Sequence, residues 1–271
     1  MAEQVILITG VSSGMGKVCA EHLAARGHRV YGASRKPEAL SSQPGFRPIR
    51  MDVTDDASVA AGVAEVLAEA GRIDVLVNNA GWGISGPIED TTIPEAQALF
   101  ETNFFGVLRT CRAVLPIMRR QGSGRIINIG SLGGRIGVPY QGIYTATKFA
   151  LEGLTETLRA EVRACGLTAS IIEPGDFHTG FTGNRRVVQA CNPSSHYWPS
   201  FQKVMRVVES DETHGSDPAL VAGLLERIID ARKPRLRYTV GMLYQRLAGF
   251  LKSVLPAPVA EWILLKYYRL L

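Results

Sequence analysis

Residues 5–20 read VILITGVSSGMGKVCA, and this stretch decides the fold. An apolar run rich in β-branched residues is followed by Gly10, Gly14 and Gly16 and then by a helix-like segment. Glycine permits positive φ and lets the backbone approach a ligand closely. The start of the next helix directs unpaired N–H groups and its positive dipole end at the same place, which suits a pyrophosphate. A glycine-rich turn without a ligand is the alternative at this point.

Residues 1–180 repeat this alternation of short apolar runs and longer helical segments. The apolar runs are nearly continuous in Val, Ile and Leu, as in strands whose two faces are both buried. The pattern predicts an α/β fold of the Rossmann type, a doubly wound parallel sheet with helices on both faces. The expected strands are Val5–Ile8, Arg29–Ala33, Pro48–Met51, Ile73–Val77, Arg125–Ile129 and Thr168–Ile172. The expected helices cover residues 14–26, 57–70, about 94–120 and 141–165.

The alternation of apolar runs and helical segments ends in the last third of the chain. Residues 177–216 are rich in Gly, Asn, Pro, Ser and His without a long periodic run, so we expect an irregular loop over a substrate. The elements expected after this loop are a helix at about 217–232 and a strand at about 236–240. The sequence thus predicts one catalytic domain over residues 1–241 and a C-terminal helical extension over residues 242–271.

The composition is that of an ordinary packed protein. Of the 271 residues, 46% are hydrophobic and 20% are charged, which excludes a disordered or low-complexity chain. The 30 basic and 25 acidic side chains give a net charge of +5, but the basic ones are scattered, so no nucleic-acid partner is expected. Residues 1–9 lack the features of a signal peptide. No Cys-x-x-Cys pair occurs, which argues against disulfides and a metal site and favours a reducing, cytoplasmic location. The cysteines are Cys19, Cys111, Cys165 and Cys191.

The end of the second expected strand indicates which nucleotide the chain prefers. A dinucleotide fold that prefers NAD usually has Asp or Glu there, whereas a basic side chain accommodates the 2′-phosphate of NADP. This chain has Ser34, Arg35 and Lys36, and the first acid is Glu38. The Arg35 guanidinium can hold a phosphate with paired hydrogen bonds. We therefore expect NADP(H), with NAD(H) less favoured; a solvated Arg-Lys turn is the alternative.

Tyr144 and Lys148 are four residues apart on a helical segment, so they share one face of the helix. An ammonium ~4 Å away, at an effective dielectric of ~20, stabilises the phenolate form of a tyrosine by about 4 kcal/mol. This corresponds to about three pKa units. We expect Lys148 to lower the pKa of Tyr144 toward neutrality, where acid–base catalysis is efficient. Ser131 follows the strand Arg125–Ile129 and faces the crevice where such folds bind ligands. A serine that only stabilises its own turn is the alternative.

Several motifs occur in order along the chain. They are Thr9–Gly16, Asn78–Gly81, Asn103, Ser131, Tyr144–Lys148 and Pro174–Gly175. Together they resemble the short-chain dehydrogenase/reductase family over about residues 4–180. The segment 144–162 and the tail from Arg237 onward resemble the hydroxysteroid and retinol dehydrogenase branch. The three-residue gap between Tyr144 and Lys148 is typical of members that act on carbonyls and alcohols rather than on alkenes.

The resemblance implies roles for individual residues. Ser131 would polarise the substrate carbonyl, Tyr144 would exchange the proton, and Lys148 would hold the nicotinamide ribose. Asn103 would complete the catalytic set by anchoring a water that links Lys148 to solvent. Asp176 and the residue after it are unusual for the family. The cofactor contacts expected, with Arg35, are Gly10, Ser12, Ser13, Gly14, Met15, Gly16, Asp52, Val53, Asn78, Ala80, Gly81, Tyr144, Lys148, Pro174, Gly175 and Thr179.

Aromatic residues in and beside the expected substrate loop suggest a hydrophobic substrate, because binding pockets rely on apolar walls. The alternative is that these rings only pack the loop. Basic residues of the loop could instead bind an anionic substrate group such as a phosphate or CoA. The expected substrate contacts are Ser131, Leu132, Tyr140, Tyr144, Phe181 and Trp198, and the basic residues are Arg185, Arg186, His196, Lys203 and Arg206.

The tail has an apolar stripe at helical spacing, interrupted by Pro256 and Pro258. A bilayer span would need about 20 mainly apolar residues, and Glu261 and Lys266 also interrupt the run. The tail is expected to pack on the core or in a homo-oligomer, a dimer or tetramer. Peripheral contact with a membrane is the alternative.

The sequence as a whole predicts an NADP(H)-dependent oxidoreductase acting on CH–OH groups. It would interconvert a secondary alcohol and a ketone or aldehyde on a steroid-, retinoid- or lipid-like substrate. Two other interpretations stay open, namely a non-catalytic NADP-binding sensor of the same fold and a reductase of an anionic acyl thioester.

Overall fold

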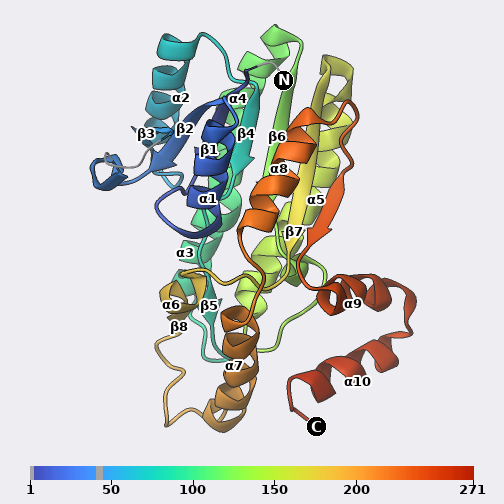
Figure 1. Cartoon of the computed structure of the whole chain (residues 1–271). Helices are drawn as coiled ribbons and strands as arrows, with labels where there is room; N and C mark the ends of the chain where they lie inside the picture. Colours follow the sequence, from blue (N-terminus) through green and yellow to red (C-terminus); the bar gives the residue numbers. More distant parts are fainter. Residues whose placement is uncertain (1–2, 41–44) are drawn as a thin grey trace.

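The computed structural model describes residues 3–40 and 45–271; residues 1 and 2 of the stretch searched for a signal peptide lie outside this part. Its centre is a seven-stranded sheet in the order β3-β2-β1-β4-β6-β7-β9, with every neighbouring pair parallel (Figure 1). The strands are β1 Val5–Thr9, β2 Arg29–Ser34, β3 Arg47–Arg50, β4 Val75–Asn78, β6 Gly124–Ile129, β7 Leu167–Pro174 and β9 Arg237–Val240. The strand order reverses between β1 and β4, where open α/β sheets bind ligands.

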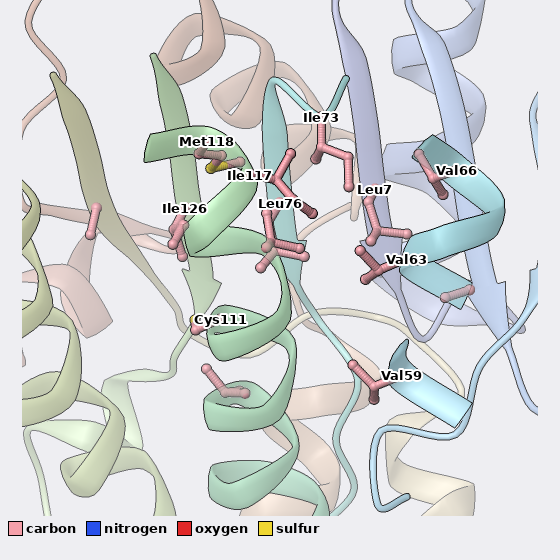
Figure 2. Close-up of a cluster of buried hydrophobic side chains, with 14 of the residues drawn as sticks. Leu7, Val59, Val63, Val66, Ile73, Leu76, Cys111, Ile117, Met118 and Ile126 are labelled. Carbon is pink, nitrogen blue, oxygen red and sulfur yellow. The ribbon is translucent and has the colours of Figure 1, made fainter. Parts of the chain in front are cut away.

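Helices cover both faces of the sheet. α1 packs beside α8 on one face, while α2, α4 and α5 cover the other. Successive side chains of β1 point to opposite faces of the sheet. Ile6 and Ile8 are buried under α1 and α8, whereas Leu7 belongs to the core on the opposite face. Figure 2 shows that opposite core between the sheet, α2 and α4. The helices are α1 Gly14–Ala25, α2 Asp56–Ala70, α4 Gly106–Gln121, α5 Gly142–Val162 and α8 Ala219–Asp230. The predicted doubly wound sheet is confirmed.

The segment expected as one helix over about 94–120 contains a local irregularity. It consists of α3, Ile93–Phe100, a π-helical turn over Glu101–Phe105, and α4. The N–H of Gly106 donates to the carbonyl of Glu101, five residues back. Such a turn rotates the residues that follow it and is frequent near functional sites.

The prediction that residues 177–216 form an irregular loop is wrong for the second half of that segment. The helix α7 extends from Trp198 to Thr213. Its buried side chains Phe201, Val204, Met205 and Val208 recur at helical spacing and pack in a third core. The polar residues before this helix obscure that period in the sequence. The first half holds α6, Phe181–Asn184, and β8, Arg186–Val187, which pairs with β5, Ile84–Ser85.

The C-terminal extension is helical, as expected. It forms α9, Leu243–Val254, and α10, Ala257–Tyr267, which project together from the end of the sheet where β9 finishes (Figure 1). Pro256 lies between the two helices, whereas Pro258 lies in the first turn of α10 and does not interrupt it. Within residues 3–40 and 45–271, no helix is both long and apolar enough to cross a bilayer.

Candidate active site

A cavity of about 1380 Å³ lies at the carboxyl ends of the parallel strands. It begins at the end of β2 and the start of α1, passes the ends of β4, β6 and β7, and reaches α9 and α10. It therefore joins the expected nucleotide site to the expected substrate side in one continuous space. The described residues contain no group of three His, Cys, Asp or Glu side chains arranged to hold a metal ion.

The glycine-rich loop has the geometry that an anionic ligand needs. Gly10 and Gly14 have φ of +72° and +58°, and both line the cavity with Ser12, Ser13 and Met15. Ser13 is the N-cap of α1, yet its side chain accepts no hydrogen bond from the first turn. The first N–H groups of α1 therefore have no capping side chain, and a pyrophosphate fits this helix start.

Gly16 lies outside the cavity lining, which differs from its expected role as a cofactor contact. A β-carbon at this position would lie 2.3 Å from Asn79 Nδ2 and 2.4 Å from the carbonyl oxygen of Gly10. The residue is therefore needed for close packing behind the loop. Asn79 lines the cavity and donates to the carbonyls of Thr9 at 3.0 Å and Gly10 at 2.9 Å.

Asn78 also lies outside the cavity lining, so the expected direct cofactor contact is not present in this geometry. Its amide donates to Asn128 Oδ1 at 2.9 Å and accepts from Thr110 Oγ1 at 2.6 Å, and all three side chains are buried. This network joins β4 to β6 and α4. Asn78 thus braces the sheet, while Asn79, Ala80 and Gly81 line the cavity.

Arg35, Asp52 and Val53 line the end of the cavity where the adenosine of a dinucleotide is expected. Arg35 is exposed, and among the described residues its guanidinium makes no hydrogen bond or ion pair. Glu38 lies 2.9 Å from Arg50. Burial raises the pKa of Asp52, but hydrogen bonds from Thr54 at 3.0 and 2.8 Å and the charge of Arg35 outweigh it, so that the pKa lies below its usual value.

Ser131, Tyr144 and Lys148 come together on one wall of the cavity. Ser131 follows β6 and accepts a hydrogen bond from the N–H of Gly133 at 3.0 Å, which fixes its position. Its hydroxyl acts on the Tyr144 phenol of α5, whose pKa it lowers, and both side chains line the cavity. Lys148 lies one turn further along α5 and donates from Nζ to the carbonyl of Ile129 at 2.9 Å. The three residues predicted to act together are therefore neighbours.

The expected effect of Lys148 on the acidity of Tyr144 is contradicted. Burial raises the pKa of Tyr144 to about 12, and the hydrogen bond from Ser131 only partly offsets this. Burial also lowers the pKa of Lys148 to about 8. The lysine Nζ lies 5.7 Å from the centroid of the tyrosine ring. In this geometry burial outweighs the effects that lower the pKa of Tyr144, and the phenol is a weak acid.

Asn103 is buried in the π-helical turn and does not line the cavity. Its Oδ1 accepts from the N–H of Trp82 at 3.1 Å, and its Nδ2 donates to the carbonyl of Trp82 at 3.0 Å and to Thr147 Oγ1 at 3.3 Å. Its side chain therefore ties the segment after β4 to α5, beside Lys148. The water link implied by the family resemblance stays a prediction.

The expected substrate contacts divide into two groups. Leu132 and Phe181 line the cavity with Ser131 and Tyr144, and the Phe181 ring lies 5.7 Å from that of Tyr144. Tyr140 and Trp198 do not line it, so their expected substrate contact is not present. Both rings pack on Phe201, each at 5.7 Å, and Tyr140 donates to Ser200 Oγ at 2.7 Å. Phe201 belongs to α7, whose presence the sequence analysis missed, and this helix draws the two rings into the third core.

The C-terminal helices form a wall of the cavity that the sequence analysis did not foresee. Tyr267 of α10 donates to Asp211 Oδ2 at 2.6 Å and so holds the tail against α7. Gln245 of α9 is buried and donates to Asp176 Oδ2 at 2.5 Å. Contacts between residues this distant in sequence leave no periodic signal. The apolar tail residues of the wall include Leu251, Leu255, Ile263 and Leu264.

The polar part of the substrate side is acidic. Asp176, Asp211 and Glu212 all line the cavity, and burial together with the charges of Glu212 and Asp211 raises the pKa of Asp176 to about 7. Arg185 is buried against Glu212, so for this residue the alternative of binding an anionic substrate group is contradicted. Arg186 does line the cavity, and its guanidinium lies 4.6 Å above the ring of Trp82.

Comparison with known proteins identifies the family. The sequence profile described as short chain dehydrogenase matches residues 4–189, so the chain belongs to the short-chain dehydrogenase/reductase family and is an oxidoreductase. It is 42% identical over 270 residues to a 3-ketodihydrosphingosine reductase of Bacteroides thetaiotaomicron, covering 100% of both chains. It is 36% identical over 256 residues to 17-beta-hydroxysteroid dehydrogenase type 1 of Homo sapiens, covering 88% of this chain and 77% of that one. The expected family is confirmed, with hydroxysteroid dehydrogenases among its relatives.

Solved structures agree with this assignment. A short-chain dehydrogenase of Streptomyces avermitilis has a TM-score of 0.84 and 38% identity, covering 96% of this chain and 97% of that one. A short chain dehydrogenase/reductase of Burkholderia phymatum in complex with NAD has a TM-score of 0.76 and 29% identity, covering 87% of this chain and 88% of that one.

Proposed function

We propose that this protein is an NADP(H)-dependent reductase that converts the ketone of a long-chain substrate into a secondary alcohol, and that an amino ketone is the preferred substrate. The observation that carries the proposal is one continuous cavity. It joins Arg35 and the glycine-rich loop to Ser131 and Tyr144, and it then continues between acidic side chains and the apolar tail.

The residues at the nucleotide end fit NADP(H). The uncapped start of α1 would receive the pyrophosphate, and the exposed guanidinium of Arg35 would pair with the 2′-phosphate. Lys148 lies at the wall where a nicotinamide ribose would be held. Bound NADPH supplies the hydride, and the side chains around it supply the proton and the orientation.

Tyr144 is suited to give a proton to a ketone oxygen. With a pKa of about 12 it stays protonated at neutral pH. As hydride reaches the carbonyl carbon, the oxygen becomes an alkoxide, which is a much stronger base than a phenolate and therefore takes the phenolic proton. Ser131, which lines the cavity with Tyr144, would hold that oxygen in place. The protonated form of Tyr144 is the form that reduction of a ketone requires.

The substrate side supports a long-chain amino ketone. Three carboxyl groups, Asp176, Asp211 and Glu212, line the cavity, and Arg185 is buried against one of them. The acidic excess suits a cationic group on the substrate, while the tail helices offer an apolar wall for an alkyl chain. 3-Ketodihydrosphingosine, named in the relative from Bacteroides thetaiotaomicron, has an amine on the carbon beside its ketone. An anionic thioester fits this wall less well, because carboxylates would repel it.

The test is NADPH oxidation with three ketones: 3-ketodihydrosphingosine, a ketone of the same chain length without the amine, and a steroid ketone. We expect the highest kcat/KM with the amino ketone. Asp176→Asn should raise KM for it about tenfold and leave the amine-free ketone unchanged. Tyr144→Phe should lower kcat about 10²- to 10⁴-fold for every ketone while NADPH still binds.

Two results would decide against parts of the proposal. A wild-type protein that binds NADPH but oxidises it with none of the ketones would support the non-catalytic sensor. Equal kcat/KM for the amino and amine-free ketones, unchanged by Asp176→Asn, would leave a ketone reductase without amine recognition.

A further inference from the structure

The outer surface of the C-terminal helices is unusually apolar. Most of the large apolar side chains exposed within residues 3–40 and 45–271 belong to α9, α10 and the chain end. Phe250 is 60% exposed and Trp262 is 53% exposed, and neither lines the cavity. We call the following residues the tail face: Leu243, Leu247, Phe250, Val254, Val259 and Trp262. Large apolar side chains exposed in such number on one segment normally mark a site of contact with a partner or a membrane.

The same segment is basic. Residues 242–271 contain Arg246, Lys252, Lys266 and Arg269 against the single acid Glu261, and all five side chains are exposed. Lys266 lies with its Nζ 5.0 Å above the ring of Trp262, so a cation accompanies the largest apolar side chain of the tail face. Helices with exposed apolar side chains and a basic excess are typical of segments that lie in the interface of anionic bilayers.

The two helices contact the body of the protein through their inner sides, where Tyr267 donates to Asp211 of α7. They extend as a pair beyond the end of the sheet, and their outer sides are free of other described elements (Figure 1). Their inner sides carry Leu251, Leu255 and Leu264, which line the cavity. The tail therefore has one apolar side toward the cavity and another toward the outside.

We propose that the tail face seats the protein on the surface of an anionic lipid bilayer. A second copy of the chain is the other occupant to weigh, but its tail face would offer Arg246 and Lys266 no carboxylate, because the single tail acid Glu261 lines the cavity. Anionic lipid headgroups instead neutralise these charges, while the acyl boundary accepts Phe250 and Trp262. The charge of the tail thus favours the bilayer.

The tail face also bears on how substrate enters the cavity, provided that the proposed function holds. Since the helices on the bilayer also wall the cavity, a long-chain ketone would pass from the membrane to Ser131 and Tyr144 without crossing water. Binding to the bilayer itself does not depend on which substrate is reduced.

The test is flotation of the full chain with vesicles of phosphatidylcholine alone and with phosphatidylserine added in about a 3:1 ratio. We expect binding to the anionic vesicles. Phe250→Ser with Trp262→Ser should weaken it about a hundredfold, because each removes about tenfold. Arg246→Ala and Lys266→Ala should each weaken it about fivefold. Lipids brominated in their acyl chains should quench tryptophan fluorescence, and Trp262→Phe should remove most of the quenching while binding persists.

Matched controls are available away from the tail. Leu220 is 52% exposed and Ile93 is 71% exposed, and Leu220→Ser with Ile93→Ser should leave vesicle binding unchanged. Melting curves and NADPH binding of each variant confirm that it is folded. Equal binding by wild type and the Phe250/Trp262 double variant would overturn the proposal. The proposal would also be overturned if the wild type were a dimer that does not bind vesicles and the double variant were a monomer, because the tail face would then bind a second copy. Neither result depends on turnover, so a failure of membrane binding can be distinguished from a failure of the proposed function.

Discussion

Replacement of Arg35 tests the nucleotide preference most directly. Its guanidinium lines the cavity, and among the described residues it is held by no hydrogen bond or ion pair, so it is available to a 2′-phosphate. Hydrogen bonds to a charged group are worth roughly 1.5–3 kcal/mol, so Arg35→Ala should weaken NADPH binding about 10- to 150-fold. In Arg35→Asp a carboxylate would face a phosphate of charge about −2 at roughly 6 Å. This adds about 1.4 kcal/mol even in water, or about another tenfold.

The assay is titration of each protein with NADPH and with NADH, followed by nucleotide fluorescence. NADH lacks the 2′-phosphate, so its Kd should change less than about threefold in either variant. Arg47→Asp is the matched control, because Arg47 is an exposed arginine of the next strand that pairs with Glu65 and Glu69 and does not line the cavity. Equal weakening of NADPH and NADH by Arg35→Asp would refute the reasoning, as would a wild-type protein that binds both equally.

Three further predictions concern the interior. Arg185→Met should lower the free energy of unfolding by about 3–5 kcal/mol in denaturant melts, because Glu212 would stay buried without its cation. The double variant Arg185→Met/Glu212→Gln should recover part of the loss. A single variant as stable as the wild type would speak against a buried ion pair. Gly16→Ala should prevent NADPH binding, because its β-carbon would lie 2.4 Å from a backbone oxygen, whereas Gly183→Ala, with open space around it, should bind normally. Burial lowers the pKa of Lys148 from its ordinary value of 10.5 to about 8. Between these two pH values the unfolded chain binds more protons than the folded one, so the contribution of Lys148 to stability should rise with pH across that window. Lys148→Met should abolish this rise, which is about 3 kcal/mol in urea melts; a constant difference between wild type and variant from pH 7 to 10 would contradict the shift.

The sheet and most helices were predictable because their signals are local. β1 and β4 are runs of apolar residues buried on both faces, and α5 follows a helical period from Gly142 to Val162. α7 was missed although its apolar residues recur at helical spacing, because polar residues crowd the segment before it.

The site shows the same division. Ser131, Tyr144 and Lys148 were placed together from their spacing and from the strand that precedes them. Adjacent residues at a strand end point to opposite faces, and the sequence does not show whether Asn78 or Asn79 is the one that faces the cavity. The acidity of Tyr144 was misjudged because its burial depends on residues far along the chain, such as Phe181, whose ring lies 5.7 Å away.

The sequence by itself determined the succession of most strands and helices along the chain, the glycine-rich turn and the residues proposed as catalytic, because each of these depends on neighbours in the chain. Only the tertiary structure decided which of those residues reach the cavity, how far burial shifts their pKa values, and that α9 and α10 close its far side. These properties depend on which distant segments exclude water from a given atom, and periodicity along the chain carries no record of that.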